Sequence, residues 1–265
     1  MKPKWRFTYI YPPFEKIFGE EQGKLAYDQP KIMLDRVHPD DQDMLMKKIN
    51  GQMDYSKPCV YRIMNIEGDY LTFEEYTTPV YKDGELVAIQ GILRNITWKL
   101  KLQEDLEYKS THDSLTKVFN RQVFEELMDR YNQLENVPIG IVVCDLDELK
   151  YINDNLGHKQ GDFLIKNVAN ILNSYSDNHV IVSRIGGDEF AILITNMTKP
   201  SVETLIEKIE REIAIYNEGY YEIRIQMSIG YSYSKWSIGK MERLFEYADK
   251  NMYENKERRK SKRSE

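Results

Sequence analysis

Short apolar runs bounded by turn residues are the main pattern in the second half of the chain. They are rich in β-branched and aliphatic residues, which predicts buried strands over 139–144, 180–182 and 190–194. Apolar residues at helical spacing predict helices over 121–134, 158–173, 201–216 and 241–260. Helices that alternate with short strands in this way indicate a mixed α+β unit.

The first 96 residues show a different pattern. A helix is expected to begin at Pro39, because Asp40 and Asp41 behind it suit the positive end of a helix dipole. A strand is expected over 5–10, and a helical turn over 14–19 that ends at Gly19. Alternating residues predict three more strands, separated by hairpin turns at Glu67-Gly68 and Lys82-Asp83-Gly84, over 60–66, 70–80 and 86–92.

Residues 97–110 connect the two parts. Trp98, Leu102 and Leu106 recur every four residues among lysine, glutamine and glutamate, which predicts an amphipathic helix too short to be stable alone. Its apolar stripe would pack on the first unit or pair with the same helix of a second chain. The simpler interpretation is a spacer.

Composition and charge narrow the class of protein. With 265 residues the chain is long enough for two modest domains, and 41% hydrophobic and 30% charged residues are typical of a soluble globular protein. The net charge of −6 argues against nucleic-acid binding. Cys59 and Cys144 fall in separate units and predict buried free thiols in a reducing compartment. Neither a membrane-spanning apolar run nor a signal peptide is found, so a cytoplasmic location is expected.

Acidic residues stand at the ends of two predicted strands. Asp188 and Glu189 follow Gly186 and Gly187, which predict a tight hairpin turn because glycine tolerates positive φ. Asp145 closes the first apolar strand. If these strands are neighbours, Asp145 and Asp188 converge, and two carboxylates with phosphate oxygens suit Mg²⁺. An ordinary hairpin with a solvated Asp-Glu pair is the alternative.

In their order along the chain, these residues resemble the motifs of the GGDEF family of diguanylate cyclases. The resemblance covers about residues 111 to 260. It rests on Asp113-Ser114-Leu115-Thr116 with Asn120-Arg121, Asp145-Leu146-Asp147-Glu148-Leu149-Lys150 through Asp154, Gly157-His158, Gly161-Asp162, Gly186-Gly187-Asp188-Glu189-Phe190, Ser228-Ile229-Gly230, and Ala248-Asp249 with Met252-Tyr253 and Lys256. It implies a mostly antiparallel sheet with helices on both sides, similar to the nucleotide cyclase and ferredoxin-like cores.

The first unit resembles a PAS sensor domain, with an antiparallel sheet and short helices. The residues that carry this resemblance are Val37-His38-Pro39-Asp40-Asp41, Tyr61-Arg62-Ile63, Asp83-Gly84 and Arg94-Asn95-Ile96-Thr97. We expect no bound cofactor, or an unknown small ligand, and interpret His38 as a structural residue rather than a haem ligand. The predicted organisation is a PAS domain over 1–96, a linker helix over 97–110 and a GGDEF domain over 111–265.

The family resemblance implies a reaction in which two GTP molecules condense into cyclic di-GMP and release two pyrophosphates. Each domain of a homodimer holds one GTP, so that the two reacting groups face each other. Asp145, Asp188 and the Leu146 carbonyl are expected to bind Mg²⁺, with Mn²⁺ as an alternative. Glu189 is expected to be the base or orienter for the 3′-hydroxyl, and Lys150 to neutralise phosphate charge.

Further residues match the family's substrate-binding positions. The backbone N–H groups of Glu148 and Leu149 would hold phosphate at a helix start. Asn153 and Asp162 would read guanine, because a carboxylate accepts hydrogen bonds from its N1–H and N2–H₂ groups. The remaining expected contacts, one near guanine and two on the triphosphate, are His158, Lys256 and Lys260. Singly, each has an ordinary structural interpretation, such as a helix cap or a surface lysine; the ordered set favours the functional one.

Two departures from the family pattern bear on function. Arg259-Lys260 stand where the family usually has Gly-Arg, so Lys260 would supply charge without a bidentate fork. Residues 177–180 read Asp-Asn-His-Val where many members carry Arg-x-x-Asp, so product inhibition through that site is not expected. A catalytically silent GTP-binding or scaffolding module is the alternative function, and the intact Asp145, Lys150, Asp188 and Glu189 favour the cyclase.

Overall fold

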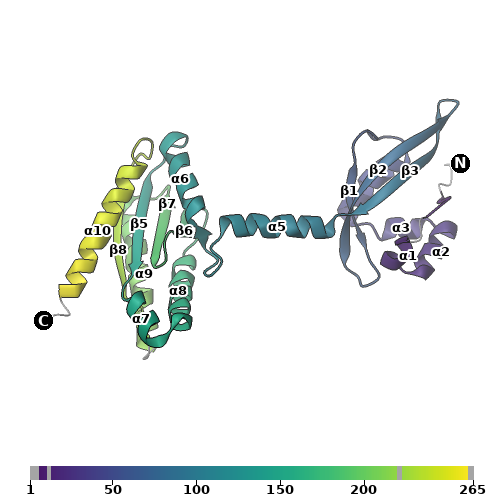
Figure 1. Cartoon of the computed structure of the whole chain (residues 1–265). Coiled ribbons are helices and arrows are strands. Elements are labelled where there is room, and N and C mark those ends of the chain that lie inside the picture. The colour runs from purple at the N-terminus through teal and green to yellow at the C-terminus, as the bar shows by residue number, and fades with distance from the viewer. Residues whose placement is uncertain (1–5, 11–12, 220–222, 262–265) are drawn as a thin grey trace. The chain divides into compact units, whose positions relative to one another are not determined.

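A computed structural model describes residues 6–10, 13–219 and 223–261 (Figure 1). Contacts within the chain divide it into two units, Met1–Asp105 and Leu106–Glu265. Each unit has its own buried core, so each is described separately.

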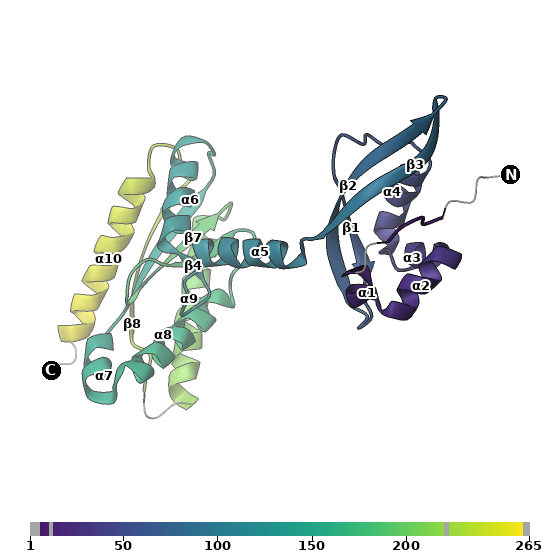
Figure 2. The ribbon, with the colours of Figure 1, turned by 45° about the vertical axis from the view of Figure 1, so that its right-hand side comes forward.

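The N-terminal unit consists of short helices beside a three-stranded antiparallel sheet (Figure 2). Its elements are α1 (Pro13–Phe18), α2 (Glu20–Asp28), α3 (Lys31–Asp35), α4 (Pro39–Ile49), β1 (Cys59–Met64), β2 (Tyr70–Lys82) and β3 (Glu85–Asn95). The strand order is β1-β2-β3. Residues from the helices and from β1 and β2 form one apolar core, which includes Phe18, Leu45 and Phe73.

Most local predictions for this unit are confirmed, and one is wrong. The three predicted strands are present, and Asp83 and Gly84 both have positive φ in the hairpin between β2 and β3. The strand expected over 5–10 is not formed: residue 5 lies outside the described residues, and residues 6–10 form no strand. The backbone N–H of Ile10 donates instead to the hydroxyl of Tyr27, at 2.7 Å. His38 caps α4 by accepting from the N–H of Asp40.

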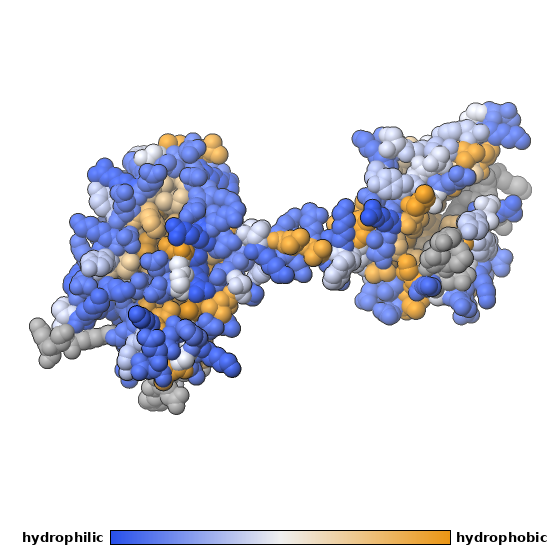
Figure 3. All heavy atoms as spheres, in the orientation of Figure 1, coloured by the Kyte–Doolittle hydropathy of each residue, from blue (hydrophilic) through white to orange (hydrophobic). Residues whose placement is uncertain are grey.

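Helix α5 (Thr97–Thr111) follows β3 almost directly, and the boundary between the two units falls inside it. No residue of α5 is buried. Trp98 is 76% exposed, and Leu102 and Leu106 are also exposed. Figure 3 shows apolar surface on this helix. Trp98 and Leu102, the residues of this stripe that belong to the N-terminal unit, therefore do not pack into its core.

The C-terminal unit is built around a five-stranded sheet of order β4-β6-β7-β5-β8. Among the described strands of this sheet, β4 pairs with β6 in parallel and the other pairs are antiparallel. The strands are β4 (Phe119–Asn120), β5 (Ile139–Leu146), β6 (Val180–Arg184), β7 (Glu189–Thr195) and β8 (Met227–Ser234). The helices are α6 (Arg121–Gln133), α7 (Leu149–Leu156), α8 (His158–Asn173), α9 (Lys199–Gly219) and α10 (Met241–Ser261).

Helices cover both faces of this sheet, and β5 lies inside it between β7 and β8 (Figure 1). Every residue of β5 is buried, because alternate side chains enter two separate cores. Val142 and Cys144 pack with α8 and α9 on one face, whereas Ile141 and Val143 pack with α6 and α10 on the other. The expected α+β class, with a mostly antiparallel sheet between helices, is confirmed. In the described part of the chain, no helix is long and apolar enough to span a membrane.

Candidate functional site

The acidic residues predicted to converge stand at one end of neighbouring strands. β5 pairs with β7, and Asp145 lies opposite Glu189 in the antiparallel ladder. The backbone hydrogen bonding continues one residue before β7, because the N–H of Leu146 donates to the Asp188 carbonyl at 2.9 Å. The expectation that the two strands are neighbours is therefore confirmed. Asp145, Glu189 and Asp188 are brought to the same edge of the sheet.

The glycines of the hairpin have a different purpose from the expected one. Gly186 and Gly187 are not among the residues with positive φ, so the prediction that the turn needs a left-handed backbone is wrong. The carboxylate of Glu189 instead folds back across Gly186, and a Cβ at that position would meet Oε2 and the side-chain carbons of Glu189. Glycine at 186 therefore makes room for the Glu189 carboxylate.

A cation already lies beside Asp145. The ammonium group of Lys256 on α10 donates to Oδ1 of Asp145 at 2.6 Å. Burial acts to lower the pKa of Lys256, but the hydrogen bond and charge of Asp145, followed by the charges of Asp147 and Asp188, outweigh it and raise that pKa. The ammonium group of Lys256 therefore interacts with acidic residues at the end of β5 and in the hairpin before β7.

The donor set at this edge fits a hard cation. Asp145, Asp188 and the Leu146 carbonyl offer oxygen atoms, which Mg²⁺ prefers. The ammonium group of Lys256 supplies the positive charge that pairs with Asp145. Within the described ranges, no three His, Cys, Asp or Glu side chains form a group able to hold a metal by themselves. A bound ion would therefore need further oxygens from backbone, water or phosphate.

Glu189 has an environment suited to a base. Burial raises the pKa of Glu189, and the charges of Asp188, Asp145 and Asp249 raise it further, whereas Arg121 acts in the opposite direction. Asp249 on α10 and Arg121 at the start of α6 were part of the recognised motifs, but sequence reasoning gave them no role. Their charge close to Glu189 is visible only in the folded chain.

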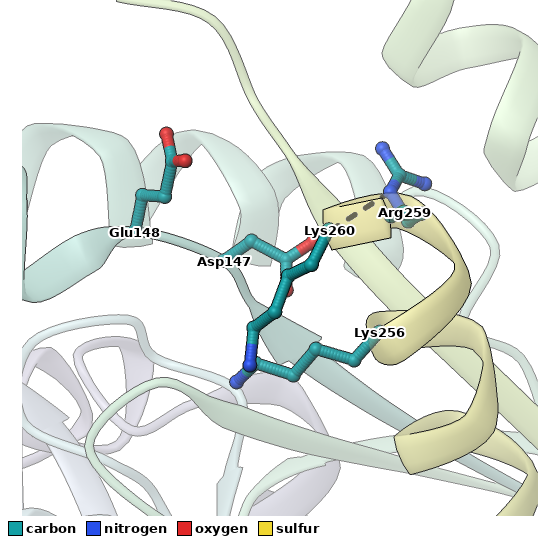
Figure 4. Close-up of a pocket in the computed structure, with 5 residues that line it drawn as sticks. All are labelled: Asp147, Glu148, Lys256, Arg259 and Lys260. Atoms are coloured by element: carbon teal, nitrogen blue, oxygen red, sulfur yellow. Dashed lines mark ion pairs between the residues drawn. The ribbon is translucent and has the colours of Figure 1, made fainter. Parts of the chain in front are cut away.

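A small pocket adjoins this acidic edge. It is lined by Asp147, Glu148, Lys256, Arg259 and Lys260 (Figure 4). Lys256 and Lys260 both line the pocket, and their ammonium groups pair with Asp145 at 2.6 Å and with Glu257 at 3.0 Å. Two ammonium groups at one pocket favour an anionic ligand there.

The turn beneath the pocket is the one expected to bind phosphate. Glu148 has a φ of 63° and precedes α7, which starts at Leu149. The preceding residue is fixed by a hydrogen bond from the N–H of Asp147 to the Gln226 carbonyl at 2.8 Å. Lys150 is exposed in the first turn of α7. The turn thus presents a helix N-terminus beside the lysines of α10.

The residues expected to bind guanine come from two successive helices. Gly157, with a φ of 88°, ends α7 and begins α8. The amide oxygen of Asn153 lies where a Cβ on Gly161 would be, so α8 needs glycine there. Asp162 is the next residue and is exposed, as is His158 at the start of α8. The fold brings Asn153 next to Gly161 and Asp162.

An ion pair that the sequence did not reveal ties the hairpin to the start of the unit. Asp113 accepts from the N–H and hydroxyl of Thr116, at 2.8 and 2.6 Å, and from Nη1 of Arg184 at 3.0 Å. Nη2 of Arg184 donates to the Gly187 carbonyl at 2.7 Å. The only sequence signal was one basic residue at the end of an apolar strand.

Comparisons with known proteins agree with this geometry. A family model described as "Diguanylate cyclase, GGDEF domain" matches residues 110–262, and one described as "PAS fold" matches residues 7–93. The cyclic di-GMP phosphodiesterase PdeR of Escherichia coli is 30% identical over 165 residues, which are 62% of this chain and 25% of PdeR. The probable diguanylate cyclase DgcE of the same organism is 26% identical over 219 residues, which are 80% of this chain and 20% of DgcE.

A solved structure supports the fold. The coiled coil and GGDEF domain of DgcB from Caulobacter crescentus, in complex with c-di-GMP, aligns with a TM-score of 0.53 and 24% identity, over 61% of this chain and 88% of that one. This chain spans a quarter or less of the length of PdeR and DgcE.

Proposed function

Because the chain belongs to the GGDEF family of diguanylate cyclase domains, with a PAS fold ahead of that domain, we propose that it is a PAS-regulated cyclase that condenses two GTP molecules into cyclic di-GMP. The observation that carries the proposal is the contact of Lys256 with Asp145, at the edge where Asp188 and Glu189 also stand. This edge binds positive charge and lies beside a pocket lined by lysines.

Asp145, Asp188 and the Leu146 carbonyl would hold Mg²⁺, or Mn²⁺ in its place. When bound, the ion supplies positive charge to the phosphate oxygens and orients them. The chain's own cations then complete the phosphate site. Lys256 would leave Asp145 for the triphosphate, and Lys260 would add a second ammonium group. The N–H groups of Glu148 and Leu149 would donate hydrogen bonds to phosphate oxygens.

Glu189 would accept the proton of the attacking 3′-hydroxyl or orient that hydroxyl. The raised pKa of Glu189 lies closer to neutral pH than that of an ordinary glutamate, which suits a general base. The missing Cβ of Gly186 lets this carboxylate turn toward the strand ends. Lys150, exposed at the start of α7, would neutralise charge that develops on the phosphates.

Selection of GTP over ATP would rest on Asn153 and Asp162, with His158 close by. The Asp162 carboxylate accepts hydrogen bonds from guanine N1–H and N2–H₂, and adenine has no such pair of donors. Asn153 stands beside Gly161 and can meet another edge of the base. A site built to bind these donors rejects a base that lacks them, because the bound base would cover polar groups and leave them unpaired.

The proposed reaction needs a homodimer, because each catalytic domain holds one GTP and the two must face each other. The exposed stripe of Trp98, Leu102 and Leu106 on α5 provides a surface on which two copies can pair. A small ligand bound by the PAS domain would regulate the cyclase through this pairing. Exposing the apolar side chains of Trp98, Leu102 and Leu106 to water is unfavourable, which supports their burial against a second copy of α5.

We further propose that the upstream product site found in many family members does not operate here. At residues 177–180, the side chain of Asp177 closes a turn by accepting from the N–H groups of His179 and Val180, at 2.7 and 2.8 Å. This Asp177 carboxylate repels phosphate, and the stretch contains no arginine to bind it.

A second candidate is a GTP-binding regulatory module without cyclase activity. It is favoured by the match to PdeR, which is named as a phosphodiesterase and is similar to this chain over a quarter of its own length. Incubation of the purified protein with GTP and Mg²⁺ separates the two functions. The cyclase forms cyclic di-GMP and pyrophosphate, and Glu189→Gln lowers that rate by about 10²–10⁴-fold while GTP still binds. Binding without product in the wild-type protein would establish the silent module.

A further inference from the structure

Arg259 lines the pocket but has no role in the function above. We propose that Arg259 is a positioning residue: it neutralises the buried carboxylate of Asp147, so that this carboxylate does not compete with the triphosphate for Lys256. This inference rests on the proposed binding of GTP and deepens it.

The buried carboxylate of Asp147 lies where its negative charge would oppose the binding of an anionic ligand. It is 7% exposed and lies in the wall of the pocket. The hydroxyl of Ser228 is 3.0 and 2.9 Å from its two oxygens, and Nε of Arg259 is 3.6 Å from Oδ2. A buried carboxylate without a cationic partner is costly, and it also repels phosphate. Arg259 therefore supplies the charge that Asp147 requires.

The positions of the three cations on α10 separate their tasks. Lys256, Arg259 and Lys260 are spaced i, i+3 and i+4, so they share one side of the helix. In Figure 4 the ammonium ends of the two lysines lie on one side of Asp147, and the guanidinium of Arg259 lies on the other. Nη1 of Arg259 also donates to the Met227 carbonyl at 2.9 Å, which anchors it at the start of β8.

Removing Arg259 would leave Asp147 to attract the nearest remaining cation. Lys256 lines the same pocket as Asp147, and its ammonium group already bonds to Asp145, two residues before Asp147 in the chain. A lysine that pairs with Asp147 is no longer free to bind phosphate. The loss would therefore fall on the triphosphate and not on the guanine or the ribose.

The test compares ligands with and without the terminal phosphates, using the full chain with Mg²⁺ in calorimetric titrations. The probes are 3′-deoxy-GTP, which has no attacking hydroxyl, and GMP. Arg259→Ala should weaken 3′-deoxy-GTP binding about tenfold and change GMP binding by less than about twofold. Adding Asp147→Asn to Arg259→Ala should restore 3′-deoxy-GTP binding to within about threefold of wild type, because no carboxylate is left to capture a lysine.

Arg258→Ala is the matched control, since Arg258 is the neighbouring arginine and its Nε bonds to the Glu254 carbonyl instead of Asp147. It should bind both probes like the wild type. Failure of the double variant to recover would mean that Arg259 contacts phosphate directly, and equal losses for both probes would mean a general structural role. Either result, or an unchanged Arg259→Ala, overturns the inference alone. A wild-type protein that does not bind 3′-deoxy-GTP overturns the proposed function as well.

Discussion

The ammonium group of Lys256 lies 2.6 Å from Oδ1 of Asp145, so the end of the sheet that should hold a metal already holds a cation. The two residues are far apart in sequence and come from α10 and β5. Because Lys256 also interacts with Asp188, one ammonium group offsets negative charge on both acidic residues. We expect it to exchange Asp145 for phosphate when both are bound.

Replacing Lys256 should separate metal binding from nucleotide binding. Lys256→Met keeps the length of the side chain but removes its charge, so Mn²⁺ no longer competes with an ammonium group at Asp145. Mn²⁺ measured by electron paramagnetic resonance without nucleotide should bind about tenfold tighter, whereas the KM for GTP should rise. Lys250→Met, on an exposed part of α10, is the control. Equal or weaker Mn²⁺ binding by Lys256→Met would show that Lys256 does not occupy the metal's place.

The pH dependence of activity should follow the neighbours of Glu189. A base works only in its ionised form, so the raised pKa of Glu189 places the acid limb of kcat/KM above the pH expected for an ordinary glutamate. Asp249→Asn removes a charge that raises this pKa and should move the limb to lower pH. Arg121→Gln removes a charge that lowers it and should move the limb the opposite way. Shifts in the same direction would refute the assignment of the limb to Glu189.

The ion pair of Asp113 with Arg184 should stabilise the C-terminal unit in a pH-dependent way. Burial acts to raise the pKa of Asp113, but hydrogen bonds from Thr116 and Arg184 outweigh it and lower the pKa. A lowered pKa contributes stability above the unfolded value, and that contribution is lost as pH falls through the folded value. Asp113→Asn should therefore cost about 1 kcal/mol in urea unfolding at pH 7. The difference should shrink as the pH falls through the lowered pKa of Asp113, and a constant difference would contradict the ionic origin.

The exposed stripe of α5 should control assembly and rate together. Leu102→Glu with Leu106→Glu places charges where two copies would pair, so sedimentation equilibrium should show a weaker dimer. The specific rate of cyclic di-GMP formation should then increase with protein concentration. Lys99→Glu, elsewhere on the exposed helix, should keep both properties of the wild type. A dimer that is unchanged by the two substitutions would place the interface on another surface.

The sequence predicted those parts that depend on local pattern. Continuous apolar runs predicted β5, β6 and β7. The resemblance of the ordered motifs to the GGDEF family predicted that Asp145 and Asp188 belong to one site. The strand expected over 5–10 failed because alternation does not guarantee a neighbour to pair with, and Ile10 bonds to a tyrosine hydroxyl instead. The partners of Asp145 and Asp113 lie 111 and 71 residues away. A single sequence does not reveal pairings over such distances.

The most direct test is a crystal structure with Mn²⁺ and 3′-deoxy-GTP, in which the anomalous scattering of manganese locates the ion. The account predicts a manganese peak shared by the carboxylates of Asp145 and Asp188, with the Lys256 ammonium group moved from Asp145 to the phosphates. A nucleotide-bound structure with no manganese at these carboxylates, or with Lys256 still on Asp145, would contradict it.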